Sequence, residues 1–256
     1  MYQSEPLLSR KSSFVKLLVL LLIIIGAGLL SFFTGILIAL PLYGSGVIET
    51  MSGGIDPANP EYIGMMKFFQ VINQVGIFII PSILFALLVS RNIARYLSLD
   101  SFPRAASIAG TILLVYLMLP AIHALAQVNE NLELPDYLQG IENWMKESEN
   151  AAARLTEAFL STTSISGLLF NIFMVGILAA VGEELLFRSV LIRLFRNWFG
   201  NIHIAVIVSA VFFSAFHLQF YGFLPRLLLG LLFGYLFVWS GSVWLPILAH
   251  FINNAS

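Results

Sequence analysis

The sequence contains no cysteine, and only 11% of its 256 residues are charged. The absence of cysteine excludes disulfide bonds, thiol nucleophiles and cysteine-ligated zinc. The charged fraction is far below the roughly 25% that is typical of soluble domains. A net charge of -1 also leaves no basic surface, so no nucleic-acid partner is expected.

Apolar residues make up 59% of the chain, and the mean hydropathy is +0.90. A helix needs about 20 apolar residues to cross the hydrocarbon of a bilayer, and apolar stretches recur along this sequence. They predict an all-α fold, a polytopic transmembrane helical bundle with about seven spans. The stretches cover residues 14–42, 65–89, 106–126, 165–199, 204–218, 223–239 and 243 onward.

The first apolar stretch follows Arg10, Lys11 and Lys16 and is longer than the roughly 7–15 residues of a cleavable signal sequence. We therefore expect it to be a retained span. The turns at 90–104 and 193–196 also carry arginines, and basic loops stay in the cytoplasm. These clusters predict a multi-pass protein of the cell (inner) membrane, surrounded by the lipid bilayer, with a cytoplasmic N-terminus.

Two polar connections interrupt the spans. Residues 43–64 contain Glu49, Asp56 and Glu61 without a basic residue, which favours a short outside loop. Residues 128–161 contain seven acidic residues against two basic ones, and we expect an outside helix lying at the membrane interface there.

The expected domains are residues 1–161, an N-terminal transmembrane region with three spans and an acidic outside segment, and residues 162–256, a catalytic transmembrane domain. The last 14 residues would form about 21 Å of helix, short of a full span. One more span beyond the C-terminus is therefore compatible with the pattern.

Three charged residues, Glu183, Glu184 and Arg188, lie in the apolar stretch 165–199. A charge at the centre of a span costs about 2.5–3.5 kcal/mol on insertion scales, so it needs a reason. Glu184 and Arg188 are four residues apart, acid first, which favours an ion pair on one helix face. The side chain of Glu183 lies about 100° around the helix from that of Glu184 and has no basic partner at this spacing. Glu183 is therefore free to take a proton as a general base.

His217 is the next ionisable residue deep in an apolar stretch. If the two helices form a hairpin that turns near residues 197–201, then Glu183 and His217 both lie about 21–24 Å from the turn. The matching depth predicts that their side chains meet. His203 and His123 lack such a partner and are read as ordinary structural histidines.

His250 and Asn254 are four residues apart and share one face of the last helix. A histidine beside an amide suits hydrogen-bond donation to an oxyanion. Counted from a turn at residues 240–242, His250 would lie only about 12 Å along the helix, shallower than His217, so the assumed helix boundaries or the straight helix must be wrong there, and Pro246 in the first turn is a candidate cause. Gly230 and Gly234 form a Gly-x-x-x-Gly pattern, which predicts close helix packing.

The three motifs Glu183-Glu184-x-x-x-Arg188, Phe213-x-x-x-His217 and His250-x-x-x-Asn254 resemble those of the CPBP intramembrane proteases, a family that includes CAAX prenyl endopeptidases. The resemblance covers residues 165–256. It implies a cavity open to the cytoplasmic side, water activated by Glu183 and His217, and an oxyanion bound by His250 and Asn254. Glu184 and Arg188 would support this catalytic site, and the substrate would be a protein or peptide at the membrane.

Members of this family are often labelled metalloproteases. Glu183, His217 and His250 are the residues that would hold a divalent metal such as zinc. The sequence has no His-Glu-x-x-His motif, so no cofactor is expected and the glutamate is expected to activate water directly.

Three function classes stay open on sequence grounds. The first is a membrane endopeptidase that hydrolyses a peptide bond. The second is a non-catalytic immunity or scaffold protein of the same family, and the third is a proton-coupled transporter, although no internal repeat supports it. The sequence discloses neither the oligomeric state nor whether a substrate is prenylated.

Overall fold

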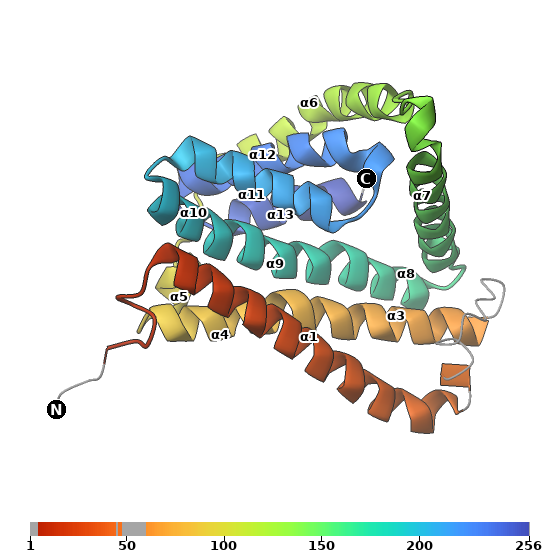
Figure 1. The fold of residues 1–256 in the computed structure, drawn as a ribbon, viewed down its shortest axis with the longest axis horizontal. Helices are drawn as coiled ribbons and strands as arrows, with labels where there is room; N and C mark the ends of the chain where they lie inside the picture. Colours follow the sequence, from red (N-terminus) through yellow and green to blue (C-terminus); the bar gives the residue numbers. More distant parts are fainter. Residues whose placement is uncertain (1–4, 45, 48–59, 256) are drawn as a thin grey trace.

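The computed structural model describes residues 5–44, 46–47 and 60–255. These residues form a helical bundle and include no strand (Figure 1), as the sequence predicts. The acidic residues Glu49 and Asp56 of the first polar connection lie outside the described residues. The helices in chain order are α1 (Ser13–Tyr43), α3 (Pro60–Gln74), η1 (Val75–Ile79), α4 (Ile80–Val89), α5 (Ile93–Tyr96), α6 (Ala105–Glu130), η2 (Asp136–Leu138), α7 (Gln139–Leu160), α8 (Ile165–Asn171), η3 (Ile172–Leu178), α9 (Ala179–Glu184), η4 (Leu185–Ile192), α10 (Arg193–Phe199), α11 (Ile202–Phe216), η5 (Phe220–Gly222), α12 (Phe223–Ser240) and α13 (Trp244–Ala255).

In the part of the chain that the structure describes, five continuous helices are long and apolar enough to cross a membrane, and α11 and α13 are shorter helices in the remaining two apolar stretches. The chain is thus a multi-pass helical membrane protein. Only 6% of the apolar window of α1 and 11% of that of α6 are buried within the bundle, against 39% for the other three. Because most of the apolar side chains in these windows are not buried against protein, the outer faces of α1 and α6 are suited to face lipid.

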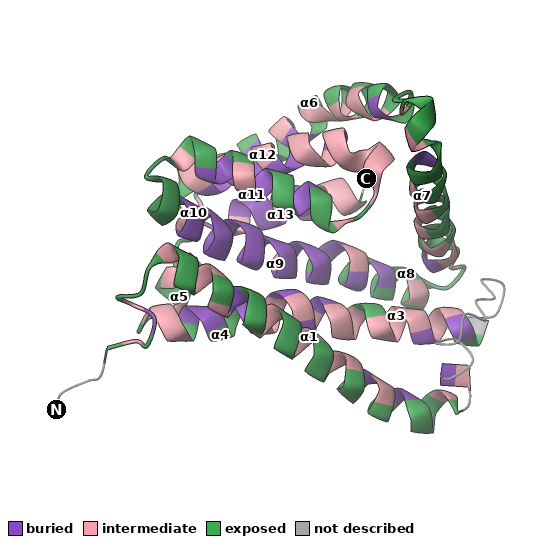
Figure 2. Cartoon of the chain, viewed as in Figure 1, coloured by how far each residue is buried: buried purple, intermediate pink, exposed green. Residues whose placement is uncertain are grey.

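The continuous helix from α8 to α10 runs through the centre of the bundle. Its middle part, around α9 and η4, is almost wholly buried (Figure 2). Two π-helical turns, η3 and η4, flank α9. Such turns change the direction in which successive side chains point and are frequent at functional sites. The three charged residues predicted on this helix lie in α9 and η4, where the bundle is most enclosed.

Helices α11 and α12 pack closely because of two glycines. A β-carbon at Gly230 would lie 2.9 Å from the Cβ and 3.0 Å from the Cα of Ala210. A β-carbon at Gly234 would lie 2.8 Å from a methyl carbon of Val206. The close packing predicted from the Gly-x-x-x-Gly pattern is therefore confirmed, and it brings α12 against the central helix behind Arg188.

The two ends of the bundle differ in charge. The end that holds α5 and α10 carries most of the arginines, and the other end is closed by the acidic helix α7, which is steeply inclined to its neighbours (Figure 1). The turn between α12 and α13 lies at the basic end, and its second half is buried against the bundle. Ser242 and Val243 are buried there, and the Val243 amide donates to the Ser98 carbonyl.

Candidate active site

Glu183 is the centre of the candidate site. Its Oε1 accepts a hydrogen bond of 3.0 Å from the side-chain amide of Gln74, which reaches it from α3. Its Oε2 is buried and has no hydrogen-bond partner. No lysine or arginine forms an ion pair with it among the residues described. Glu183 therefore presents one free carboxylate oxygen to the interior of the bundle.

Two histidines aim at this free oxygen. Nε2 of His217, at the end of α11, lies 4.0 Å from Glu183 Oε2, and Nε2 of His250, on α13, lies 3.9 Å from it. The meeting of Glu183 and His217 that matching depth predicts is thus found. Both distances exceed that of a direct hydrogen bond, so a small donor would be needed to join these atoms.

The other ring nitrogen of each histidine fixes its tautomer. Nδ1 of His217 lies 2.9 Å from the Phe213 carbonyl, which only accepts, so Nδ1 carries the proton. Nδ1 of His250 lies 2.8 Å from Oε1 of Glu184, and the same reasoning applies to that carboxylate. In the neutral form, the lone pair of each Nε2 therefore faces the free oxygen of Glu183.

Glu184 and Arg188 form the ion pair that their spacing predicts, with 2.9 Å between Oε2 and Nε, and both side chains are fully enclosed. The guanidinium carbon lies 4.4 Å from the ring centre of Phe213 and 5.4 Å from that of Phe233. Arg188 also donates to the Gly230 carbonyl at 3.4 Å. Because Arg188 is held by an ion pair, two aromatic rings and a carbonyl, it fixes Glu184 and, through Glu184, His250.

The height of His250 counted from residues 240–242 does not hold, because Nε2 of His250 and Nε2 of His217 lie 3.9 and 4.0 Å from the same oxygen of Glu183. Ser240 and Gly241 are exposed, whereas Ser242 and Val243, just before α13, are buried. Trp244 secures this position by donating its indole N–H to the Leu99 carbonyl at 3.0 Å. Helix α13 starts at Trp244, and a rise of about 9 Å along it brings Nε2 of His250 to 3.9 Å from Oε2 of Glu183.

Asn254 does not join the cluster through a hydrogen bond in the structure. Its side-chain amide donates to the Val175 carbonyl in η3 at 2.9 Å. His203 bonds to the Tyr235 hydroxyl at 3.0 Å, well removed from the cluster, which agrees with its structural interpretation. The structure thus brings together five of the predicted residues, Glu183, Glu184, Arg188, His217 and His250.

Gln74 is the neighbour of Glu183 that sequence reasoning missed. It is 4% exposed and comes from a helix more than 100 residues earlier. Its only sequence signal is an amide within the apolar stretch 65–89, where an unsatisfied polar group is costly. The same signal applies to Asn171, which accepts a hydrogen bond of 2.8 Å from Lys67.

The cluster does not have the spacing of a zinc site. Two ligands at about 2.1 Å from a tetrahedral zinc lie about 3.4 Å from each other, and the nitrogens of His217 and His250 are 4.0 and 3.9 Å from Glu183 Oε2. Among the described residues, no three His, Cys, Asp or Glu side chains are placed to hold a metal ion. The three candidate ligands therefore do not fit a zinc site in this arrangement.

Solvent reaches the cluster most easily beside His217. Its side chain is 30% exposed, against 10% for Glu183 and 6% for His250. His217 follows the last residue of α11, at the opposite end of that helix from Arg193 and Arg196. Access to the cluster in this conformation is therefore from the end of the bundle that is remote from those arginines.

The fold and the cluster define a class of protein: a multi-pass helical membrane protein with carboxylates, histidines and an arginine gathered in its interior. Residues 165–256 match the family model described as Type II CAAX prenyl endopeptidase Rce1-like. That match is consistent with the CPBP/CAAX protease family and supports a membrane endopeptidase family for this domain. Comparisons with curated proteins and with solved structures find no match.

Proposed function

We propose that this protein is an intramembrane endopeptidase that hydrolyses a peptide bond of a membrane-associated protein or peptide. The observation that carries the proposal is the convergence of three acceptor atoms. The Nε2 atoms of His217 and His250 lie 4.0 and 3.9 Å from Glu183 Oε2, and this carboxylate oxygen has no hydrogen-bond donor among the described residues. A water molecule supplies two hydrogens, so it can satisfy two of these acceptors at once.

Glu183 and His217 hold and activate this water. The carboxylate accepts one proton as general base, and the resulting hydroxide forms a bond to the carbonyl carbon of the substrate. The carbonyl π electrons move to its oxygen, which becomes an oxyanion. When the oxyanion collapses, the C–N bond breaks and the proton held by Glu183 passes to the leaving amine.

His250 stabilises the oxyanion by donating a hydrogen bond from Nε2 when the ring has taken up a second proton from solvent, and it keeps this proton while the C–N bond breaks. The Glu184 carboxylate accepts from Nδ1–H and keeps the ring in place, as the acid partner of a catalytic histidine does. Phe233 stacks on the imidazole with 5.2 Å between ring centres, and Phe213 meets its edge. Their bulk excludes water, which strengthens the electrostatic interaction at Nε2.

The decisive experiment compares wild type with Glu183→Gln on membrane-tethered peptides, using purified full-length protein in detergent. Glutamine retains an oxygen that accepts from Gln74 but cannot take the proton, so we expect cleavage to fall by on the order of 10²-fold or more with the fold preserved. Normal cleavage by Glu183→Gln would disprove the base assignment. Wild type that cleaves no peptide would instead favour the non-catalytic scaffold.

Chelator treatment tests the metal question in the same assay. With water activated by Glu183 and His217 alone, we expect the cleavage rate to stay within about two-fold of the untreated rate. Loss of cleavage on chelation, followed by recovery on adding zinc, would show that the site holds a metal.

A further inference from the structure

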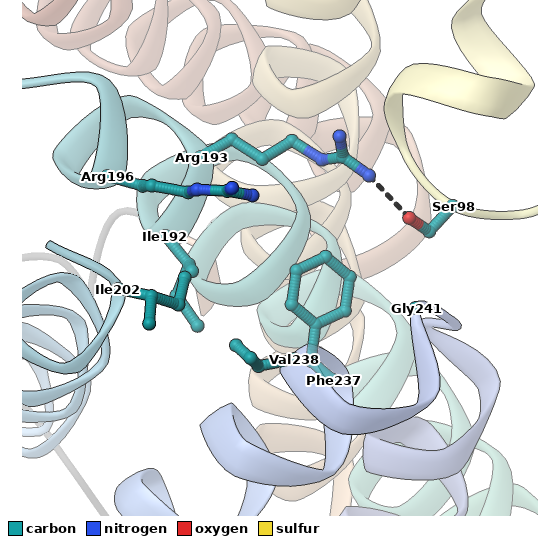
Figure 3. A pocket seen from close by; sticks show the side chains of 8 residues that line it. All are labelled: Ser98, Ile192, Arg193, Arg196, Ile202, Phe237, Val238 and Gly241. Carbon is teal, nitrogen blue, oxygen red and sulfur yellow. Dashed lines mark hydrogen bonds between the residues drawn. The ribbon is translucent and has the colours of Figure 1, made fainter. Parts of the chain in front are cut away.

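A cavity lies at the basic end of the bundle, at the far end of α11 from the candidate active site. It has a volume of about 290 Å³ and is bounded by the chain after α5, by the end of η4, α10, the start of α11 and the end of α12. Figure 3 shows two arginine side chains, Arg193 and Arg196, on one side of this cavity and apolar side chains beneath them. The lining residues are Ser98, Ile192, Arg193, Arg196, Ile202, Phe237, Val238 and Gly241.

Arg193 is held rigidly at the cavity wall. Its Nη2 donates to the Ser98 hydroxyl at 2.6 Å (Figure 3). Its guanidinium carbon lies 5.6 Å from the ring centre of Tyr96 and 5.8 Å from that of Phe237. These contacts orient the planar group before any ligand arrives, which reduces the conformational entropy lost on binding.

The two arginines are not neutralised within the part of the chain that the structure describes. Nε of Arg193 is buried and has no hydrogen-bond acceptor, and neither Arg193 nor Arg196 lies within ion-pair distance of a carboxylate. The nearby Asp100 pairs with Arg95 instead, at 3.8 Å. A buried donor without an acceptor is rare in folded proteins and needs an explanation.

The chemistry of the lining defines the ligand. Two guanidinium groups side by side suit a phosphate, because the planar fork of arginine donates two parallel hydrogen bonds to its oxygens. The cavity floor of Ile192, Phe237 and Val238 is apolar and suits a ligand with hydrocarbon next to the phosphate. A phospholipid has both parts, whereas a free phosphate ion has only the first.

The position of the cavity agrees with a lipid ligand. It lies at the ends of three apolar helices, with Trp198 and Trp239 exposed nearby. Tryptophan is enriched at the membrane–water interface. We propose that this cavity binds the phosphate group of an anionic phospholipid, with Arg193 and Arg196 as its ligands and the apolar floor against the glycerol and first acyl carbons. Basic pockets between membrane helices bind lipid headgroups in this way.

The test measures binding of short-chain phosphatidylglycerol to the purified full-length chain in a neutral detergent. An arginine that donates hydrogen bonds directly to the lipid phosphate contributes more than about five-fold to the dissociation constant. We therefore expect the dissociation constant to rise at least ten-fold in the double variant Arg193→Gln/Arg196→Gln. The matched control, Lys11→Gln/Arg104→Gln, removes the same charge from exposed positions outside the cavity, and we expect a change below two-fold.

Two further variants keep the test informative if loss of Arg193 disturbs folding. Arg196 is exposed, so Arg196→Gln should fold normally and weaken binding by more than about five-fold. Val238→Trp would fill the cavity while keeping both charges and should weaken binding at least ten-fold. Equal weakening in the cavity and control double variants would overturn the proposal, because it would show attraction by net charge alone.

Soluble competitors identify the source of the phosphate. Glycerol 3-phosphate carries the phosphate without acyl chains, and we expect it not to displace phosphatidylglycerol at a ten-fold excess. Phosphatidylcholine of the same chain length has no net charge, and we expect it to bind at least ten-fold more weakly. Full displacement by glycerol 3-phosphate would overturn the lipid assignment and make a soluble phosphate the ligand.

Discussion

Oε1 of Glu184 lies 2.8 Å from Nδ1 of His250, although 66 residues separate them along the chain. The other oxygen of the same carboxylate lies 2.9 Å from Nε of Arg188. The buried carboxylate of Glu184 therefore links the central helix to α13. Its charge is neutralised by Arg188, which lies on the same continuous helix as Glu184. Glu183, the adjacent residue, has no such cation, so the two glutamates differ in role because they differ in partners.

The first prediction compares how much the replacement of each glutamate lowers the free energy of unfolding. Glu184→Gln leaves the buried charge of Arg188 without its partner, and removing one member of a buried ion pair costs about 3–5 kcal/mol. Glu183→Gln keeps the hydrogen bond from Gln74 and should change the free energy of unfolding by less than about 1 kcal/mol. Thermal unfolding of both variants in detergent provides the measurement. Equal destabilisation would show that both glutamates are structural.

The second prediction concerns Gln74 as a positioning residue for Glu183. Replacing it by leucine removes the hydrogen bond to that carboxylate, the only one that the described residues donate, so we expect kcat to fall by about ten-fold with KM nearly unchanged. The control is Gln70→Leu, one turn earlier on α3, where the side chain is exposed. Peptide cleavage kinetics of the two variants test this role. An equal fall of kcat in Gln74→Leu and Gln70→Leu would disprove the role of Gln74 as a positioning residue.

Local rules predicted the parts of the site that lie on one helix or one hairpin. The Glu184–Arg188 pair follows from helical spacing, and the meeting of Glu183 and His217 follows from the fixed rise per residue on both sides of a turn. The height of His250 could not be predicted in this way, because the start of α13 is held by hydrogen bonds from Val243 to Ser98 and from Trp244 to Leu99. Such contacts depend on the packing of distant helices.

Gln74 illustrates the same limit. Its partner is 109 residues away, and no local pattern indicates which helix α3 will face. The helical fold itself was predictable, because the cost of exposing backbone polar groups to lipid restricts an apolar chain of this kind to helices. The pairing of those helices was not, apart from the hairpin of the central helix with α11; the two glycines of α12 indicated a close contact but not that α11 is the partner.

The third prediction uses that contact. Gly230→Ala places a β-carbon against the Ala210 backbone, which cannot rotate away, so the helices must separate. Overpacking of this kind costs about 1–3 kcal/mol, and it would also shift the carbonyl that accepts from Arg188. Gly26→Ala is the control, because nothing lies within 4 Å of its β-carbon. Unfolding in detergent should show a loss of stability for Gly230→Ala alone.

The fourth prediction concerns pH at the acidic end. The hydrogen bond from Lys146 and, next, that from the Leu134 amide lower the pKa of Glu142 below its ordinary value of 4.5. Because the folded pKa is lowered, the stabilising contribution is complete above the ordinary value and disappears as the pH falls through the lowered one.

Hydrogen exchange of the Leu134 amide, corrected for intrinsic rates, measures this loss. In wild type, protection should persist to a pH below 4.5. In Lys146→Met the largest cause of the lowered pKa is absent, so protection should be lost at a higher pH. Glu147→Gln, which alters a neighbouring exposed carboxylate, should leave the midpoint unchanged. Identical midpoints in wild type and Lys146→Met would contradict the assigned cause.

The last prediction concerns orientation in the membrane, and the cysteine-free sequence makes it easy to measure. Single cysteines at Ser101, beside the basic turn, and at Tyr137, which is 83% exposed at the acidic end, should react with a membrane-impermeant maleimide from opposite sides. Basic loops remain in the cytoplasm, so we expect Tyr137→Cys to react in intact cells and Ser101→Cys only after permeabilisation. His217, beside which solvent reaches the cluster, lies at the opposite end of α11 from the arginines of α10. This labelling result would therefore mean that substrates reach the cluster from the non-cytoplasmic side. The reverse labelling would invert the chain and place the His217 end towards the cytoplasm, which is the side that the resemblance to CAAX proteases implies.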